Sequence, residues 1–362
     1  MGKHNEANER LKREYFAFLK EARRYDEQSV DAVAKAISRF EDDTKRRDFK
    51  AFRIEQAVAF KRHLAEQPNG KGTGKLSKST VVSTLKALRN FFFWLAGQPG
   101  FKSRFTYSDA DYFNPSERDL QIAQSRRPRS TPSLEMVMTA LRAMPSDNVI
   151  ERRNRALMSF ILLTGCRDRA AVSVKLKHVS LEDRVVYLDA REVQTKFAKT
   201  ITTFFFPVGE EPVSHLVDWI GELVSDHGWK ADDPLFPATR VAPGEDDLFG
   251  AVGIERRHWS NADPVRRIFK SAFAHARLPY FQPHSLRNTL TRLGQEKCRS
   301  AEQFKAWSQN MGHEQVMTTL SSYGHVEDYR QGEIIRTLGK PNSEEERLKD
   351  LFHNFVSEAR RK

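Results

Sequence analysis

Apolar residues recur at helical spacing through the first hundred residues of the chain. One stripe lies within residues 30–40 and a second within 81–95, and each places its apolar side chains on one helical face. Ser79 and Thr80 precede the second stripe and are predicted to cap that helix. Between the stripes, QPNGKGTGKLSKST (67–80) is rich in Gly and Lys and is predicted to be a loop. This part of the chain is therefore expected to be helical.

The pattern changes twice in the rest of the chain. Residues 97–133 contain Pro, Ser and Arg with little apolar periodicity, which is typical of a linker between domains. A new helix is predicted from Thr131 to Met144. Residues 184–206 are rich in β-branched and aromatic residues and are interrupted near Phe197. That composition predicts a short antiparallel sheet of two or three strands.

Together these patterns predict a mostly α protein with a small antiparallel β-sheet, an α+β fold. A length of 362 residues suits two domains better than one. A capping box from Ser343 to Glu346, followed by an apolar stripe, indicates a last helix. We expect a helical domain, a linker, a mixed α+β domain and a C-terminal helix, at residues 1–115, 116–130, 131–340 and 341–362 respectively.

Positive charge is concentrated in the first part of the chain. The net charge is +12, and residues 1–130, with 27 Lys and Arg against 17 Asp and Glu, account for +10 of it. Such an excess favours a nucleic acid partner, because each contact with a phosphate releases counterions. A generally solubilising surface is the alternative. The basic residues that we predict to contact the phosphates of a nucleic acid are Lys71, Lys75, Lys78, Arg89, Arg126 and Arg127.

Composition argues against several other classes of protein. The longest apolar runs, such as FFFWLA (91–96), are far shorter than the roughly 20 residues that a membrane-spanning helix needs. The N-terminus lacks the apolar segment of a signal peptide. Cys166 and Cys298 give neither a disulfide framework nor a zinc-binding spacing, which favours reduced thiols. We therefore expect a cytoplasmic, nucleoid-associated protein without a membrane partner.

Four separated segments of the second domain carry the candidate chemistry. They are LLTGCRDRA (162–170), QTKFAKT (194–200), PHSLRNTL (283–290) and SQNMGHEQVMTTLSSYGHV (308–326). The first predicts a helix end at Gly165 and a turn that can hold Arg167 toward an anion. The second places two lysines at a hairpin, and the third places His284 and Arg287 on one helical face. The fourth brings a histidine and Tyr323 within ten residues of each other.

Other kinds of site fit these segments less well. GKGTGK in the Gly-rich loop is not the P-loop pattern, and no apolar strand leads into it. GHEQV lacks the second histidine of a zinc-protease motif, and no GxSxG nucleophile elbow is present.

Taken in order, the four segments resemble the motifs of the tyrosine recombinases, the phage integrases. TGCR resembles that family's TGxR, HSLR its HxLR, and NMGHEQVMTTLSSYGHV its LGHxxxxTTxxxY(T)H. The resemblance covers about residues 130–330, and the basic helical part before them is similar to the family's core-binding domain. It implies a site-specific recombinase that integrates or excises a mobile element. It further implies a homotetramer acting on paired sites in double-stranded DNA.

The resemblance implies that Tyr323 is the nucleophile. It would attack the scissile phosphodiester, form a 3′-phosphotyrosine and expel a 5′-hydroxyl. A free tyrosine has a pKa near 10, so only about one in a thousand is ionised at pH 7, and neighbouring cations and a base must assist it. Because one phosphate ester replaces another, neither ATP nor a metal cofactor is expected.

The resemblance also implies roles for the other conserved-motif positions. Arg167 and Arg287 would hold the non-bridging oxygens of the phosphate. His284 and His313 would add hydrogen bonds to it. Lys196, at the predicted hairpin, would protonate the leaving oxygen.

Three departures from the family pattern stand out. The acidic residue usual three positions after the first arginine is replaced by Ala170, and Asp168 is a candidate substitute for it. The spacing from the histidine to Tyr323 is one residue longer than the commonest spacing, and Tyr329, the other nearby tyrosine, lacks the flanking motif. Lys199 is the second candidate for the general acid.

Alternatives to the recombinase remain open at this stage. A type IB topoisomerase uses similar chemistry but relaxes supercoils without pairing two sites. A catalytically inactive DNA-binding regulator with the same fold is the other, and Ala170 is its only support. The C-terminal helix has two candidate positions, on its own domain or on a neighbouring protomer.

Overall fold

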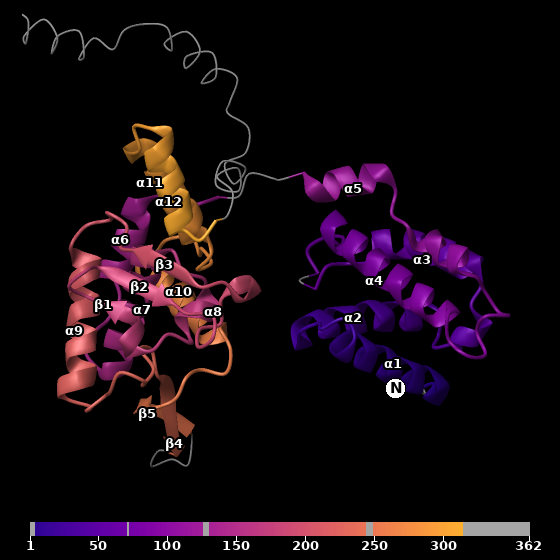
Figure 1. Ribbon diagram of the computed structural model, residues 1–362, viewed down its shortest axis with the longest axis horizontal. Coiled ribbons are helices and arrows are strands. Elements are labelled where there is room, and N and C mark those ends of the chain that lie inside the picture. Colours follow the sequence, from indigo (N-terminus) through magenta and orange to yellow (C-terminus); the bar gives the residue numbers. More distant parts are fainter. Residues whose placement is uncertain (1–3, 71, 126–129, 244–248, 314–362) are drawn as a thin grey trace, which may run out of the picture. The chain divides into compact units, whose positions relative to one another are not determined.

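The computed structural model describes residues 4–70, 72–125, 130–243 and 249–313, and the chain divides into two compact units, 1–127 and 128–362 (Figure 1). Several predicted features lie outside the described residues. They are Lys71, Arg126, Arg127, Tyr323, Tyr329 and the C-terminal helix.

The N-terminal unit is helical, as its apolar stripes predict. Its elements are α1 (Glu6–Glu21), α2 (Glu27–Asp43), the 3₁₀ turn η1 (Phe49–Ala51), α3 (Ile54–Glu66), α4 (Lys78–Ala96), η2 (Tyr107–Phe113) and α5 (Glu117–Gln124). Side chains cap the helices α1, α2, α4 and α5 at their N-termini. The cap of α4 is Ser77, whose Oγ accepts a hydrogen bond from the backbone N–H of Thr80 at 3.2 Å. The predicted cap at Ser79 and Thr80 was therefore wrong by half a turn.

Aromatic rings fill the centre of this unit. Phe92 of α4 is fully buried, and its ring centroid lies 4.3 Å from that of Phe52, 5.0 Å from Phe113 and 5.3 Å from Phe40. Such tilted, stacked and edge-to-face contacts add to the free energy gained by burying the rings. The second apolar stripe of the sequence thus forms the core face of α4.

The stretch predicted as a linker contains a helix. Residues 117–124 form α5, which packs on α4: Lys78 pairs with Asp119 at 2.7 Å, and Ser79 Oγ donates to the carbonyl of Ala123 at 3.1 Å. The prediction missed it because α5 has eight residues and buries none of them completely, so it shows little apolar periodicity.

The C-terminal unit combines helices with two small antiparallel sheets. Its helices are α6 (Leu134–Arg142), α7 (Val149–Thr164), α8 (Asp168–Ala171), α9 (Glu211–Ser225), α10 (Asp263–His275), α11 (Ser285–Lys297) and α12 (Ala301–Asn310), with the 3₁₀ turns η3 (Leu176–His178) and η4 (Lys196–Ala198). The strands β1 (Val179–Ser180), β2 (Val185–Leu188) and β3 (Ile201–Phe204) pair in the order β1–β2–β3. The predicted sheet within residues 184–206, and its interruption at η4, are confirmed.

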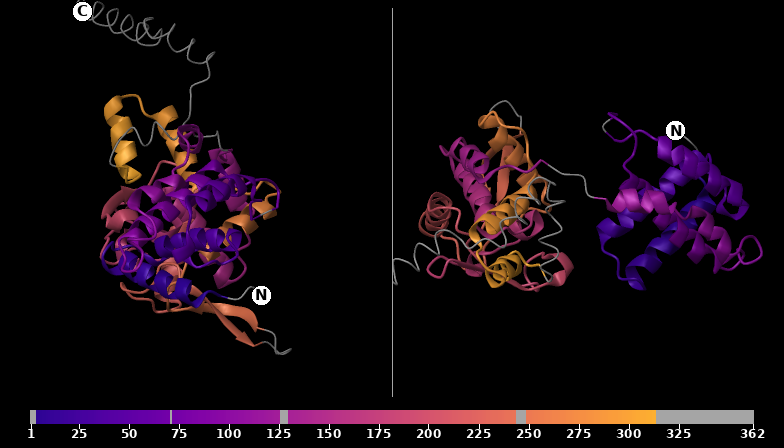
Figure 2. Two further views of the ribbon diagram at one scale, coloured as in Figure 1. Left: turned by 90° about the vertical axis from the view of Figure 1, so that its right-hand side faces the viewer. Right: turned by 90° about the horizontal axis from the view of Figure 1, so that it is seen from above.

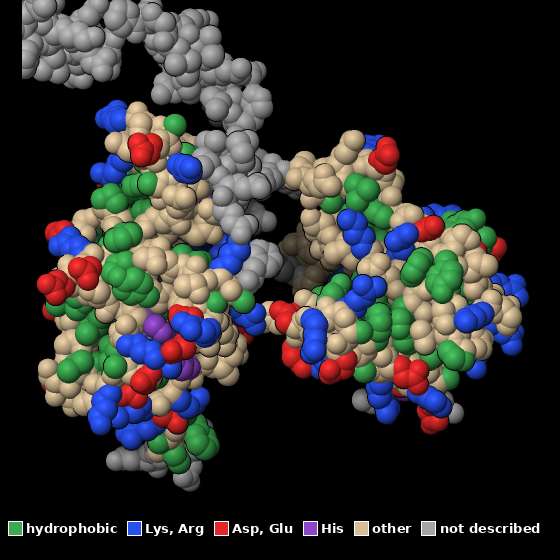
Figure 3. Space-filling view, viewed as in Figure 1, with side chains coloured by type: hydrophobic (Ala, Val, Ile, Leu, Met, Phe, Trp, Pro, Cys, Tyr) green, Lys and Arg blue, Asp and Glu red, His purple; other side chains and the backbone are tan. Residues whose placement is uncertain are grey.

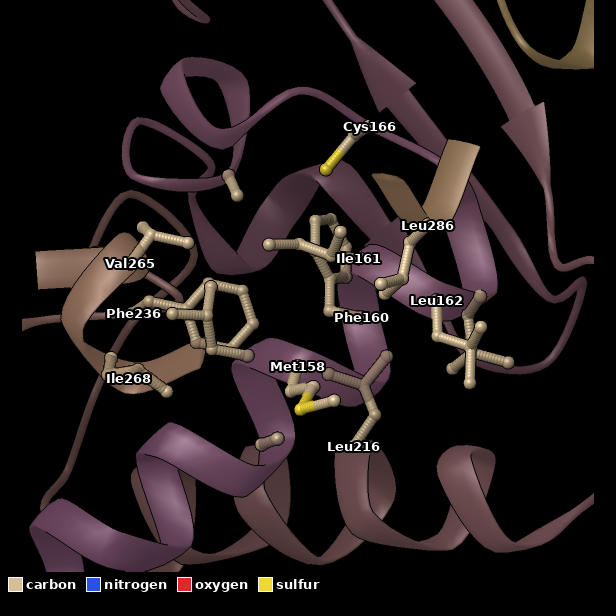
Figure 4. Close-up of a cluster of buried hydrophobic side chains, with 14 of the residues drawn as sticks. Met158, Phe160, Ile161, Leu162, Cys166, Leu216, Phe236, Val265, Ile268 and Leu286 are labelled. Atoms are coloured by element: carbon tan, nitrogen blue, oxygen red, sulfur yellow. The ribbon is translucent and has the colours of Figure 1, made fainter. Parts of the chain in front are cut away.

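Helix α7 runs through the middle of this unit. Residues 156–164 are all buried, and Figure 4 shows Met158, Phe160 and Ile161 among side chains from other helices, such as Leu216 of α9 and Leu286 of α11. The C-terminal end of α7 is tied to the sheet, since Thr203 Oγ1 donates to the carbonyl of Thr164 at 3.2 Å. This end of α7 lines the pocket of the candidate site.

A second sheet was not predicted. Strands β4 (Ala238–Pro243) and β5 (Phe249–Glu255) form a hairpin that projects from the C-terminal unit (Figure 2). Its base is held by Arg153 of α7, a buried guanidinium that donates to the carbonyl of Pro237 and to Thr239 Oγ1, both at 3.0 Å. In the part of the chain that is described, no helix is long and apolar enough to cross a membrane.

Candidate functional site

The first predicted arginine lies at the turn where α7 ends. Gly165 adopts φ +61°, and a Cβ there would lie 3.1 Å from Leu290 Cδ1, so only glycine fits without strain. The turn places Arg167 immediately before α8. Its side chain is half-buried, and it makes no hydrogen bond or ion pair with any described residue. Burial lowers the pKa of Arg167, because the charged form has lost part of its water.

The second predicted arginine, Arg287 of α11, is almost fully buried at 4% exposure. Its Nη1 donates to the carbonyl of Gly165, and its Nη2 donates to the carbonyl of Met311 at 2.7 Å. Burial, and then the like charge of Arg167, lower the pKa of Arg287 to about 10. Both partners are neutral carbonyls, and no described carboxylate pairs with this guanidinium.

His313 completes this arrangement. Its Nε2 lies 2.8 Å from Nη2 of Arg287. Gly312, just before it, has φ +70°, and a Cβ there would lie 2.8 Å from Ile201 Cδ1, so glycine lets the chain pass close over β3. Burial, followed by the charges of Arg287, Arg167 and His284, lowers the pKa of His313 to about 4.

One pocket brings three of the predicted residues together. Arg167, Lys196 and Arg287 line it, with Lys196 contributed by η4 between strands β2 and β3. Lys199 does not line the pocket. His284 is exposed at the start of α11 and does not line the pocket.

The pocket wall also contains Ala170, at 3% exposure. Asp168, the candidate substitute for the missing acidic residue, instead pairs with Arg266 of α10 at 3.3 Å. Among the described residues, no group of three or more His, Cys, Asp and Glu side chains is placed to hold a metal ion. The pocket therefore presents two guanidinium groups and a lysine, and the described partners of Arg287 are neutral, an arrangement suited to binding an anion.

Sequence reasoning did not single out three residues beside this pocket. Asn310 exchanges hydrogen bonds with the backbone of Phe204, at 2.7 and 2.9 Å, and so joins the end of α12 to β3. Thr195 lines the pocket, and Ser173 lies behind it. Asn310 could have been found from its place two residues before Gly312 in the motif. No sequence signal marks Ser173, because its partner lies 21 residues away.

The predicted DNA contacts in the N-terminal unit engage acidic neighbours where they are described. Lys75 pairs with Glu66 and Lys78 with Asp119.

Arg89 of α4 pairs with Asp111 of η2 at 2.7 Å. On the face shown in Figure 3, basic and acidic side chains are interspersed over both units. The sequence count of charges did not show this pairing, because the acidic partners of Lys78 and Arg89 come from later elements.

Solved structures with this fold include enzymes in complex with DNA. A lambda integrase dimer bound to a COC′ core site matches with a TM-score of 0.60, 15% identity, and coverage of 88% of this chain and 77% of that chain. The XerH site-specific recombinase in a post-cleavage complex with a palindromic difH substrate matches with a TM-score of 0.57, 18% identity, and coverage of 87% and 81%. The Tn1549 transposon integrase with transposon right end DNA matches with a TM-score of 0.53, 14% identity, and coverage of 91% and 99%. At these identities the likeness shows the fold, and the predicted fold class is confirmed.

By sequence, none of the curated proteins matches this chain. The model of the phage integrase family does match, over residues 134–330. That range is more than half of the chain and spans all four motif segments, from TGCR to the tyrosine. The predicted family is thereby confirmed, and the chain belongs to the phage integrase family, the tyrosine recombinases.

Proposed function

We propose that this tyrosine recombinase cuts and rejoins DNA at specific sites through a 3′-phosphotyrosine on Tyr323, and that it integrates or excises a mobile element. The observation that carries the proposal is the pair of guanidinium groups in one pocket. Arg167 has no partner among the described residues, and Arg287 is held only by neutral groups. Both guanidinium groups could therefore donate hydrogen bonds to a bound phosphate.

A phosphodiester in this pocket would gain negative charge as the tyrosine attacks. Buried guanidinium groups stabilise such charge more than exposed ones, because little water screens them. Arg287 is already oriented by the carbonyls of Gly165 and Met311, so little reorganisation is needed when the charge develops.

We assign the protonation of the leaving 5′-oxygen to Lys196. Its side chain reaches the pocket that both arginines line, whereas Lys199 does not. A positioned acid of this kind contributes about 10²–10⁴-fold to a rate.

The histidines would hold the phosphate. A guanidinium can only donate hydrogen bonds, so Nε2 of His313 accepts from Arg287 and its proton lies on Nδ1 in the free enzyme. His284, exposed at the start of α11, is proposed as a further donor.

We propose double-stranded DNA as the partner and a homotetramer on paired sites as the working assembly. The solved relatives include a lambda integrase tetramer bound to a Holliday junction, with a TM-score of 0.55, 15% identity, and coverage of 85% of this chain and 77% of that chain. Residues 1–115 would form the core-binding domain and residues 131–340 the catalytic domain. The enzyme would act in the cytoplasm, at the nucleoid.

The proposal predicts a covalent link between Tyr323 and DNA. Nicked duplexes from the DNA that flanks the protein's own gene would be incubated with wild type and with Tyr323→Phe in EDTA. Wild type alone is expected to give a slow-migrating protein–DNA band on a denaturing gel. Tyr329→Phe is the matched control and should still give the band. A band that persists in Tyr323→Phe would refute the assignment of the nucleophile, and no band with wild type would favour an inactive regulator.

A second prediction concerns the charge of His313. Its pKa is about 4 in the folded enzyme, against 6.5 for a free histidine. Between pH 6.5 and 4 the unfolded chain therefore takes up a proton that the folded chain does not, and stability falls as the pH falls through that window. In NMR titrations, the His313 Cε1–H signal, assigned with His313→Gln, should stay constant from pH 8 to about 5. Arg167→Gln should raise the pKa by removing a like charge. Titration of the wild-type signal near pH 6.5 would contradict this account.

A third prediction concerns which basic residues of the N-terminal unit contact DNA. The Lys75–Glu66 pair is well exposed, so Lys75 can exchange Glu66 for a phosphate at little cost. Replacing Lys71, Lys75 and Lys78 together by Ala should weaken DNA binding and lower the salt slope by about 0.9 for each lost phosphate contact. Lys20→Ala, which breaks an exposed ion pair with Glu27 in the same unit and is not among the predicted contacts, is the comparison and should leave the slope unchanged. Equal slopes for wild type and the triple variant, in fluorescence anisotropy at several salt concentrations, would exclude the loop as a DNA contact.

A further inference from the structure

Ser173 forms a bridge between two parts of the pocket. It is buried at 7% exposure and lies two residues after the end of α8 at Ala171. Its Oγ donates to the carbonyls of Arg169 and Ala170, at 3.2 and 3.1 Å, and accepts a hydrogen bond from the backbone N–H of Gln194 at 2.9 Å. One hydroxyl thus joins the helix that starts after Arg167 to the segment that carries the pocket lysine.

The segment that carries Lys196 is held partly by hydrogen bonds within itself, such as that from Thr195 N–H to the carbonyl of Val193 at 2.7 Å. It connects β2 to β3 over residues 189–200, and Lys196 lies two residues after Gln194. Thr195, between them, has a buried hydroxyl with no hydrogen-bond partner among the described residues. Earlier in the segment, Glu192 forms ion pairs on the exposed surface, which restrain a backbone weakly. Of the described hydrogen bonds that join this segment to another part of the unit, the bond from Gln194 N–H to Ser173 is the closest in sequence to Lys196 on its N-terminal side.

We propose that Ser173 is a positioning residue for the general acid. By holding the backbone at Gln194 against α8, it fixes the distance between the Lys196 ammonium and a phosphate bound at Arg167. This inference rests on the proposed function, in which Lys196 gives its proton to the 5′-oxygen as the P–O bond breaks. A misplacement of about 1 Å in such a group can cost on the order of a hundredfold in rate.

The step that Ser173 serves can be isolated chemically. In a duplex whose scissile 5′-bridging oxygen is replaced by sulfur, attack by the tyrosine breaks a P–S bond and releases a 5′-thiolate. A thiol has a pKa near that of cysteine, about 8.5, so the thiolate leaves without a proton from Lys196. The sulfur substrate removes the need for the acid but keeps the need for the arginines.

The experiment compares single-turnover cleavage of oxygen and sulfur duplexes, made in the sequence that wild type links covalently. On the oxygen duplex, Ser173→Ala should be slower by about 10- to 100-fold and Lys196→Ala by about 10²–10⁴-fold. On the sulfur duplex, both should come within a few-fold of wild type, whereas Arg287→Ala should be slow on both. Ser159→Ala is the matched control, because Ser159 is also buried and loses a hydrogen bond, to His215, on the side of α7 that packs on α9. It should resemble wild type on both duplexes.

Two results would overturn the inference. Ser173→Ala that cleaves the oxygen duplex at the wild-type rate would show that the bridge does not matter. A defect of Ser173→Ala that is equally large on the sulfur duplex would place its effect on the arginines or on folding. Failure of the proposed function looks different: wild type would then form no covalent product on either duplex. If wild type reacts but the sulfur duplex does not restore cleavage by Lys196→Ala, the general acid is another group. The proposed role of Ser173 would then be refuted together with that of Lys196.

Discussion

The buried guanidinium group of Arg287 holds three segments of the C-terminal unit together. Arg287 has left water almost completely, and its charge is compensated by two backbone carbonyls and an imidazole instead of a described carboxylate. Burying a charge without an opposite charge is costly, so such a group needs well-placed hydrogen bonds. Here the acceptors of those bonds lie at the end of α7 and in the segment after α12, so the bonds connect both segments to α11. An incoming phosphate would supply the missing negative charge.

Two glycine turns place the hydrogen-bond partners of Arg287 beside it. Gly165 lets α7 end in a left-handed turn whose carbonyl faces Arg287, and Gly312 lets the chain pass over Ile201 toward His313. A side chain at either position would be strained, because both residues have positive φ and a Cβ would also crowd Leu290 or Ile201. The glycines of the TGCR and GH segments are therefore explained by the backbone conformation that each turn requires. The chemistry of the motifs depends on these turns as much as on the charged side chains.

The sequence was sufficient for the fold class, the family and the residues that meet in the pocket, because local motifs encode them. The turn at Gly165, the helical face at Arg287 and the pairing of β2 with β3 all follow from short-range patterns. What it missed depends on contacts between distant residues. The hydrogen bond of Ser173 is with Gln194, 21 residues away, and the helix α5 and the hairpin β4–β5 show too little periodicity to be recognised. The basic count of the first domain likewise did not show that Lys78 and Arg89 face acidic partners.

The central claim is that guanidinium groups in this pocket stabilise negative charge on the scissile phosphate. Its most direct test is single-turnover cleavage by Arg167→Ala of two duplexes, one with an ordinary phosphodiester and one with an uncharged methylphosphonate at the scissile position. Arg167 makes no hydrogen bond to described residues, so its removal should leave the fold intact. A clamp worth about 3 kcal/mol predicts a loss of about a hundredfold on the phosphodiester. The loss should shrink to a few-fold on the methylphosphonate, whose phosphoryl group carries one negative charge fewer in the ground state and in the transition state. An equal loss on both duplexes would contradict the account.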